Sequence, residues 1–200
     1  MTWKGDFMRI CVFGAASNEI ENEYIEIVEK MGKALAERGH DLVFGAGGSG
    51  LMGAAARGFT QGGGNIIGVI PHFFKEAAIE AIYDKCDELI YTDTMRERKA
   101  KMEDEAEAFI IVPGGIGTFE EFYEVLTLKQ LGRHDKPIAI YNINGYYEST
   151  KLMLEHSVKE GFVKENCKYL YGYFDSFDEM IDYIEANKKY DFSVNDLKNG

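Results

Sequence analysis

Three glycines and a threonine stand between an apolar run and an amphipathic segment. Gly114, Gly115 and Gly117 follow the run 108–112, and Thr118 comes directly after them. Glycines leave backbone N–H groups uncovered, and a helix that begins here adds about half a positive charge at its N-terminus. With the threonine hydroxyl added, a phosphate monoester fits better than a carboxylate. The segment therefore predicts a phosphate cradle.

A simpler interpretation applies to the same segment. Thr118 and Glu121 have the spacing of a capping box, in which the threonine caps the helix and the glutamate reaches back to it. Such a cap contributes about 0.5 to 2 kcal/mol and needs no ligand. A cap does not require three glycines, however, so the cradle is favoured and the cap stays open as the alternative.

A second glycine-rich turn spans residues 44–53 and contains the pattern G-x-G-x-x-G. A dinucleotide fingerprint also needs an acidic residue at the end of the next strand, where this chain has Pro71 and His72. We therefore expect a turn that faces phosphate or ribose rather than an NAD site, with Gly47, Gly48 and Ser49 as binding residues. A third small-residue loop, 14–17, follows the first strand, so three strands could supply one crevice.

The densest basic cluster lies in residues 95–102. At helical spacing Met95, one cation of the pair Arg98 and Lys99, and Met102 share one side, which places that cation among apolar residues. The alternative is a solvated helix face with ion pairs to the glutamates that follow.

Other chemistries find little support. The four histidines are far apart, and the chain contains no HExxH, Walker A or Gly-x-Ser-x-Gly motif. We expect no metal and no cofactor.

The elements that position these residues alternate regularly. Strands are expected at 9–13, 41–44, 65–70, 88–91, 108–112 and 137–141, because these runs are continuously apolar and rich in β-branched residues. Helices are expected at 24–35, 51–60, 95–105, 118–131, 146–160 and 176–185, the last with a capping box at Ser176 and Glu179. Residues 169–174 add an edge strand or an aromatic surface patch.

This alternation predicts an α/β fold, a Rossmann-like doubly wound parallel sheet with ligands at the carboxyl ends of its strands. We expect a single domain over residues 1–186 and a flexible tail over 187–200.

Charge and composition limit the partners. The net charge of -12 disfavours nucleic acid and anionic membranes, and the longest apolar runs are too short to cross a bilayer. Three cysteines without CxxC spacing, and no apparent signal peptide, fit a reducing cytoplasm.

The segment 113–121, PGGIGTFEE, matches the PGGxGTxxE signature of the Lonely Guy family, the cytokinin riboside 5′-monophosphate phosphoribohydrolases. Arg98 and Lys99 match the family's upstream RK pair, and residues 47–53, 131–137 and 144–147 resemble further landmarks. The resemblance covers about residues 8–185. It implies a Rossmann-like fold, a homodimer or higher homo-oligomer, and hydrolysis of the N-glycosidic bond of a nucleoside 5′-monophosphate.

The resemblance also implies residue roles. The four residues of the cradle would hold the 5′-phosphate, Glu121 would stabilise the positive charge that develops on the sugar, and Arg98 would anchor phosphate or assist the departing base. Further binding residues would be Glu80, Met95, Lys99 and Thr127. Ile116 stands where the family often has tyrosine, so AMP and N6-modified, cytokinin-type nucleotides both remain candidate substrates. The alternative is a nucleotide-binding or carrier protein without turnover.

Overall fold

A parallel sheet forms the centre of the molecule. The computed structural model describes residues 7–76 and 81–198. In this part of the chain all strand pairs are parallel and the strand order is β4-β3-β2-β1-β5-β6-β7. The strands are β1 (Arg9–Phe13), β2 (Asp41–Phe44), β3 (Ile66–Pro71), β4 (Glu88–Thr92), β5 (Ala108–Ile111), β6 (Ile138–Tyr141) and β7 (Gly172–Phe174). The six predicted strands are confirmed, and the aromatic segment supplies the edge strand β7.

The six predicted helices are confirmed to within about two residues at their ends, and the short helices α3 and α8 were not predicted. They are α1 (Asn22–Glu37), α2 (Gly50–Gly62), α3 (His72–Glu76), α4 (Met95–Glu105), α5 (Ile116–Gln130), α6 (Glu148–Lys159), α7 (Phe177–Ala186) and α8 (Val194–Leu197), with 3-10 turns η1 (Ile143–Gly145) and η2 (Glu165–Tyr169). The expected helix 146–160 begins two residues later than predicted, because η1 and Tyr147 occupy the turn after β6.

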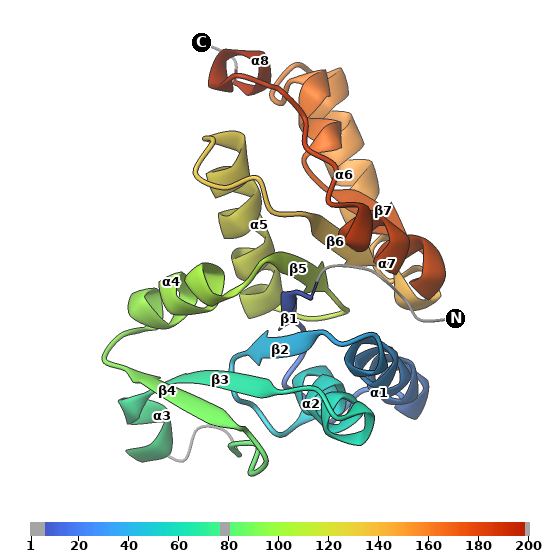
Figure 1. Cartoon of the computed structure of the whole chain (residues 1–200). Helices are drawn as coiled ribbons and strands as arrows, with labels where there is room; N and C mark the ends of the chain where they lie inside the picture. Colours follow the sequence, from blue (N-terminus) through green and yellow to red (C-terminus); the bar gives the residue numbers. More distant parts are fainter. Residues whose placement is uncertain (1–6, 77–80, 199–200) are drawn as a thin grey trace.

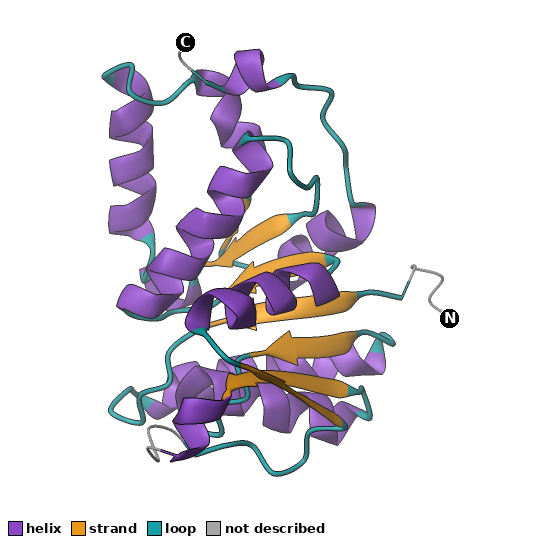
Figure 2. Ribbon diagram, turned by 90° about the vertical axis from the view of Figure 1, so that its left-hand side faces the viewer, coloured by secondary structure: helices purple, strands orange, loops and turns teal. Residues whose placement is uncertain are grey.

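Helices cover both faces of the sheet. α1, α2 and α7 pack on one face through residues such as Val28, Ala54 and Ile181, and Figure 1 shows them on one side of the strands. α4 and α5 cover the other face through Met102 and Phe122, and Figure 2 shows both lying across the strands. The doubly wound α/β architecture is confirmed. Its connections change direction between β1 and β5, where such folds open a crevice.

Some of the 22 glycines serve helix packing rather than ligand binding. A Cβ on Gly32 of α1 would lie 2.5 Å from the Ala55 oxygen of α2, and one on Gly58 would lie 2.2 Å from the Glu29 oxygen. These two helices approach closely because neither glycine carries a side chain.

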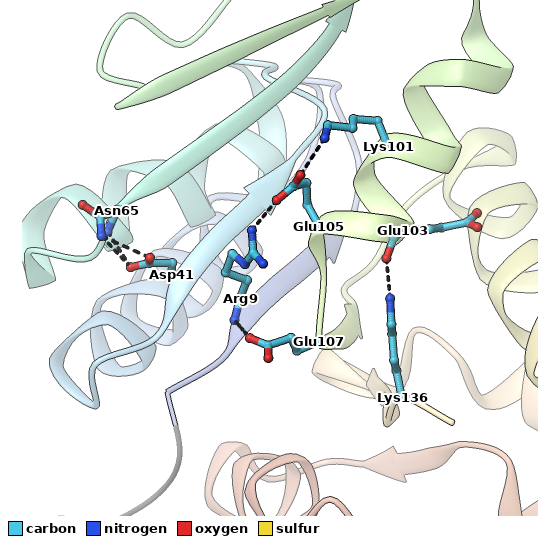
Figure 3. Close-up of polar contacts among 8 residues, drawn as sticks. All are labelled: Arg9, Asp41, Asn65, Lys101, Glu103, Glu105, Glu107 and Lys136. Carbon is cyan, nitrogen blue, oxygen red and sulfur yellow. Dashed lines mark hydrogen bonds and ion pairs between the residues drawn. The ribbon is translucent and has the colours of Figure 1, made fainter. Parts of the chain in front are cut away.

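Charged residues at the amino ends of the strands bind one another (Figure 3). Asp41 accepts hydrogen bonds from the backbone and side chain of Asn65, and the backbone N–H of Arg9 donates to Glu107 at 2.9 Å. The Arg9 side chain pairs with Glu105 of α4. This network stabilises the strand starts, and it lies at the edge opposite to the expected site.

Two local expectations need correction. Ser176 precedes α7 but makes no side-chain cap hydrogen bond, so the capping box predicted there is wrong. The segment after residue 187 is not without structure, because α8 has its own capping box between Ser193 and Asp196, and Leu197 is only 4% exposed. The predicted mobility of the tail stays a prediction.

Candidate functional site

A cleft of about 420 Å³ lies at the carboxyl edge of the sheet, where the connections change direction. Its walls come from the loop after β1, from the loop after β5 and from the start of α2. Tyr24 and Tyr146 close it with an edge-to-face ring contact at 6.5 Å. The small-residue loops after β1 and β5 therefore meet at one cleft, whereas the segment after β2 contributes only Leu51 of α2 and not its glycine turn. The lining residues are Ala15, Ser17, Glu19, Ile20, Glu21, Tyr24, Leu51, Pro113, Gly114, Gly115 and Tyr146.

The N-terminus of α5 borders this cleft. The helix begins at Ile116, with Gly115 as its N-cap residue, so Thr118 is already inside the first turn. The capping box of Thr118 and Glu121 is therefore wrong. Thr118 is buried instead, and a Cβ on Gly114 would lie 2.1 Å from its Oγ1. Gly114 is thus needed to seat the threonine.

The other two glycines of the cradle face open space. A Cβ built on Gly115 or Gly117 meets no atom within 4 Å, so packing does not require glycine at either position. The first N–H groups of a helix have no partner inside it, and in the described part of the chain no other residue accepts from the amides of Gly115, Ile116 and Gly117. These amides are free to bind an anion, which the helix dipole also favours.

Carbonyl groups of the same loop are all occupied. The Tyr147 hydroxyl donates to the Val112 oxygen at 2.8 Å, the Ala15 N–H to the Pro113 oxygen at 3.0 Å, and the Tyr146 hydroxyl to the Gly114 oxygen at 2.6 Å. The loop is therefore fixed through its acceptors while its donors stay available.

The second glycine turn is built differently. The Gly48 N–H donates to the Ala81 oxygen, and at the start of α2 the amide of Gly50 donates to Asn18 and that of Leu51 to Ala15. Since these donors are used within the protein, α2 does not offer the open N-terminus that α5 does. Gly47, Gly48 and Ser49 stay predicted binding residues.

Arg98 does not lie on a solvated face. Its side chain is buried beside Met102, as one of the two predicted arrangements requires. Nε donates to the Val69 oxygen and Nη2 to the Gly45 oxygen, each at 3.1 Å, and Cζ lies 5.6 Å from the centre of the Phe74 ring. The guanidinium thus reaches the carboxyl ends of β2 and β3.

Glu121 of α5 is half-buried and lies within electrostatic reach of Arg98. Burial raises its pKa to about 7, and the nearby Arg98 guanidinium limits this rise. The structure therefore brings the two predicted catalytic residues into electrostatic contact, one turn along α5 from the open amides. A carboxyl group that titrates near neutral pH is suited to acid-base or electrostatic catalysis.

The remaining predicted binding residues are scattered. Lys99 forms ion pairs with Glu120 and with Glu124, the latter at 2.6 Å, and so connects α4 to α5. Met95, at the start of α4, is 39% exposed. Thr127 lines a separate groove of about 540 Å³ between α5 and α6. Glu80 lies outside the described residues.

Three residues at the site were not predicted as site residues. Gly45 accommodates Arg98, and Tyr24 and Tyr146 form walls of the cleft. Two sequence signals could have found two of them: Gly45 begins the G-x-G-x-x-G pattern, and the landmark at 144–147 supplies both tyrosines that bind the loop after β5.

Metal-binding clusters and membrane-spanning helices are both absent from the described residues. These residues contain no group of three His, Cys, Asp or Glu side chains able to hold a metal ion. No helix in them has the length and apolar character needed to span a membrane.

An open helix N-terminus beside a cleft at the change of strand direction defines an α/β protein of the ligand-binding doubly wound class. The family model described as "Possible lysine decarboxylase" matches residues 52–184. The cytokinin riboside 5′-monophosphate phosphoribohydrolase LOG2 of Arabidopsis thaliana is 40% identical over 165 residues, 82% of this chain and 76% of that protein. The probable family member LOGL3 of Oryza sativa subsp. japonica is 36% identical over 184 residues, 92% of this chain and 86% of that protein. The chain belongs to this phosphoribohydrolase family, and the predicted resemblance is confirmed.

Solved structures with the same fold are more distant. A Moco carrier protein from Chlamydomonas reinhardtii has a TM-score of 0.67 at 21% identity, covering 92% of this chain and 98% of that one. The molybdenum cofactor binding protein from Rippkaea orientalis has a TM-score of 0.66 at 17% identity, covering 92% and 97%. At these identities the likeness establishes the fold alone.

Proposed function

We propose that the protein hydrolyses the N-glycosidic bond of a nucleoside 5′-monophosphate, AMP or an N6-modified adenosine monophosphate, to the free base and ribose 5-phosphate. The observation that carries this proposal is the open N-terminus of α5 one turn from the pair of Arg98 and Glu121. Family membership supports it, because the curated relatives are named as cytokinin riboside 5′-monophosphate phosphoribohydrolases.

In this proposal the 5′-phosphate binds the free amides of Gly115, Ile116 and Gly117, next to the buried Thr118. The ribose then extends along the first turn of α5 toward Glu121. As the bond to the base breaks, the sugar becomes positively charged, and the carboxylate of Glu121 stabilises that charge or activates the attacking water. Arg98 anchors the phosphate or assists the departing base.

The name of the family model suggests a different reaction, the decarboxylation of lysine. Lys99 is the lysine of the RK pair, and its ammonium group is held by Glu120 and Glu124, which raise its pKa. A lysine that forms an imine must be deprotonated, so this environment disfavours that role.

A panel of nucleoside 5′-monophosphates, analysed by chromatography for released base, tests the proposal. We expect adenine from AMP, and a loss of at least about 100-fold in rate for Glu121→Ala, the size expected for loss of an electrostatic catalytic group. Binding of AMP without release of base by the native protein would favour the carrier function instead.

We further propose that two copies associate over the groove between α5 and α6. Thr127 lies nine residues beyond Thr118, or about 13 Å along the helix axis, too far to reach a phosphate at the N-terminus of its own α5. A binding role for Thr127 would therefore act on the substrate of a second copy. Apolar side chains such as Leu126, Leu154 and Val158 line this groove, which supports an apolar contact there.

Light scattering coupled to size-exclusion chromatography tests this association. We expect at least twice the mass of 22.6 kDa for the native protein and a shift toward the monomer for Val158→Glu. An unchanged mass in the variant would move the interface elsewhere, and a monomeric native protein would contradict the proposal.

The free cysteines fit a reducing cytoplasm, which stays a prediction.

A further inference from the structure

The backbone at Gly45 lies against the buried guanidinium of Arg98. Nη2 donates to the Gly45 oxygen at 3.1 Å, and a Cβ built on Gly45 would lie 1.8 Å from the same Nη2 and 2.9 Å from Cζ. No pair of non-bonded atoms tolerates such distances, so the guanidinium occupies the space of the missing side chain. Gly45 does not adopt a positive φ, and an alanine would therefore not strain the backbone itself.

The helix α4, which carries Arg98, is held at both ends. Thr94 caps its first turn by accepting from the Glu97 N–H, and Glu97 accepts in turn from the Asp93 N–H. At the other end Glu105 pairs with Arg9, and Figure 3 shows this contact together with the bond from Lys136 to the Glu103 oxygen. A side chain added at Gly45 would thus displace the guanidinium rather than the helix.

Displacing Arg98 has a specific electrostatic consequence for Glu121. The carboxyl group is buried, and its charged form is stabilised by Arg98 and, more weakly, by Lys99. Acidic groups on its own helix oppose this, and the Cys11 thiol of β1 lies near it. The charged or titratable groups that act on Glu121 are Arg98, Lys99, Glu120, Glu124 and Cys11.

We propose that Gly45 is a positioning residue: its missing side chain leaves the space in which the Arg98 guanidinium lies, and so keeps this cation within electrostatic reach of Glu121. The first glycine of the pattern G-x-G-x-x-G then serves an arginine of the protein and not a bound phosphate. The catalytic consequence rests on the proposed function, whereas the geometric claim does not.

A double-mutant cycle with Gly45→Ala, Arg98→Ala and the combined variant tests this. The first readout is the NMR titration of carboxyl groups in protein labelled with ¹³C-glutamate, in which Glu121→Gln identifies the signal of Glu121. We expect Gly45→Ala to raise the pKa of Glu121 as Arg98→Ala does. In the Arg98→Ala background, where the space is empty, Gly45→Ala should cause no further shift.

Hydrolysis of AMP is the second readout. Gly45→Ala should lose most of the activity that Arg98→Ala loses, and the combined variant should equal Arg98→Ala. The matched control is Gly64→Ala, which also creates a clash, 2.7 Å from the His40 oxygen, but at the opposite edge of the sheet. It should leave the titration of Glu121 unchanged, so a general loss of packing is distinguished from loss of the arginine.

Additive effects of the two substitutions, or a normal titration of Glu121 in Gly45→Ala, would overturn the proposal. If Gly45→Ala does not fold, the combined variant decides: recovery of folding supports the proposal, and equal instability contradicts it. If the native protein releases no base from AMP, the proposed function fails, while the titration still decides the role of Gly45.

Discussion

Glu121 is the residue at which stability and chemistry oppose each other. Its carboxyl group is placed where burial raises the pKa from an ordinary value near 4.5 to about 7. Between these two values the folded protein binds more protons than the unfolded chain, so this group makes stability fall as the pH rises from about 4.5 to 7. A raised pKa of this kind is typical of carboxyl groups that act in catalysis.

A test at the residue scale is Glu121→Gln, which keeps the shape and removes the ionisation. At pH 8 we expect the variant to be more stable than the native protein, by up to about 3 kcal/mol, and at pH 4 nearly as stable. Thermal unfolding at both pH values measures this. Glu103 has a pKa raised to about 7 as well, so some pH dependence should persist in the variant.

If the native protein were more stable than the variant at pH 8, burial would not destabilise the charged form of Glu121. The same Glu121→Gln protein should have little activity, because glutamine cannot stabilise a cationic sugar as a carboxylate does.

The N-terminus of α5 is the element that presents free hydrogen-bond donors to a ligand. Four consecutive features act together there: a loop fixed through its carbonyl groups, a glycine that seats Thr118, two glycines that face open space, and the dipole of a helix of 15 residues. Only the last two features concern a ligand. The helix would form without glycine at position 117, so packing within the protein does not explain this residue, whereas access of a ligand to the backbone does.

Gly117→Ala separates these roles. Inside a helix, alanine is more stable than glycine by about 0.8 to 1 kcal/mol, and no atom lies within 4 Å of the new methyl group. We expect a raised melting temperature together with weaker binding of AMP, because the methyl group covers the anion site. Calorimetric titration with AMP and thermal unfolding measure the two effects. Normal AMP affinity in this variant would place the phosphate elsewhere.

In the molecule as a whole, the C-terminal segment packs against η2 and the end of α5. Leu197 of α8 packs against Cys167 and Leu170, and both the Gln130 side chain and the Cys167 thiol donate to its carbonyl oxygen. The segment therefore protects η2 and the end of α5, at a distance from the candidate site.

Leu197→Ala should lower stability by about 2 kcal/mol, near the lower end for buried leucine, since the site is peripheral. It should also make Cys167 reactive toward a thiol reagent under native conditions. Cys11, which is buried in β1, should stay unreactive. The rate at which adenine is released from AMP should be unchanged. A Cys167 that stays unreactive in the variant would show that α8 does not cover it.

The local elements could be predicted from the sequence because each depends on nearby residues. Apolar β-branched runs gave the six predicted strands, periodic apolar positions gave the main helices, and alternation of the two gave the doubly wound sheet. The motif 113–121 identified the family, since three glycines at that spacing are specific. Fraying was expected after residue 187 because a single buried leucine has no periodic signal.

Long-range contacts were decided only by the tertiary structure. Whether Arg98 faced water or the ends of β2 and β3, and whether the amides of α2 were free, depended on residues 30 or more positions away, such as Gly45 and Asn18. Hydrogen bonds and steric contacts of this kind arise when distant segments meet at one edge of the sheet. Sequence determines which groups are available, and packing determines which of them remain available to a ligand.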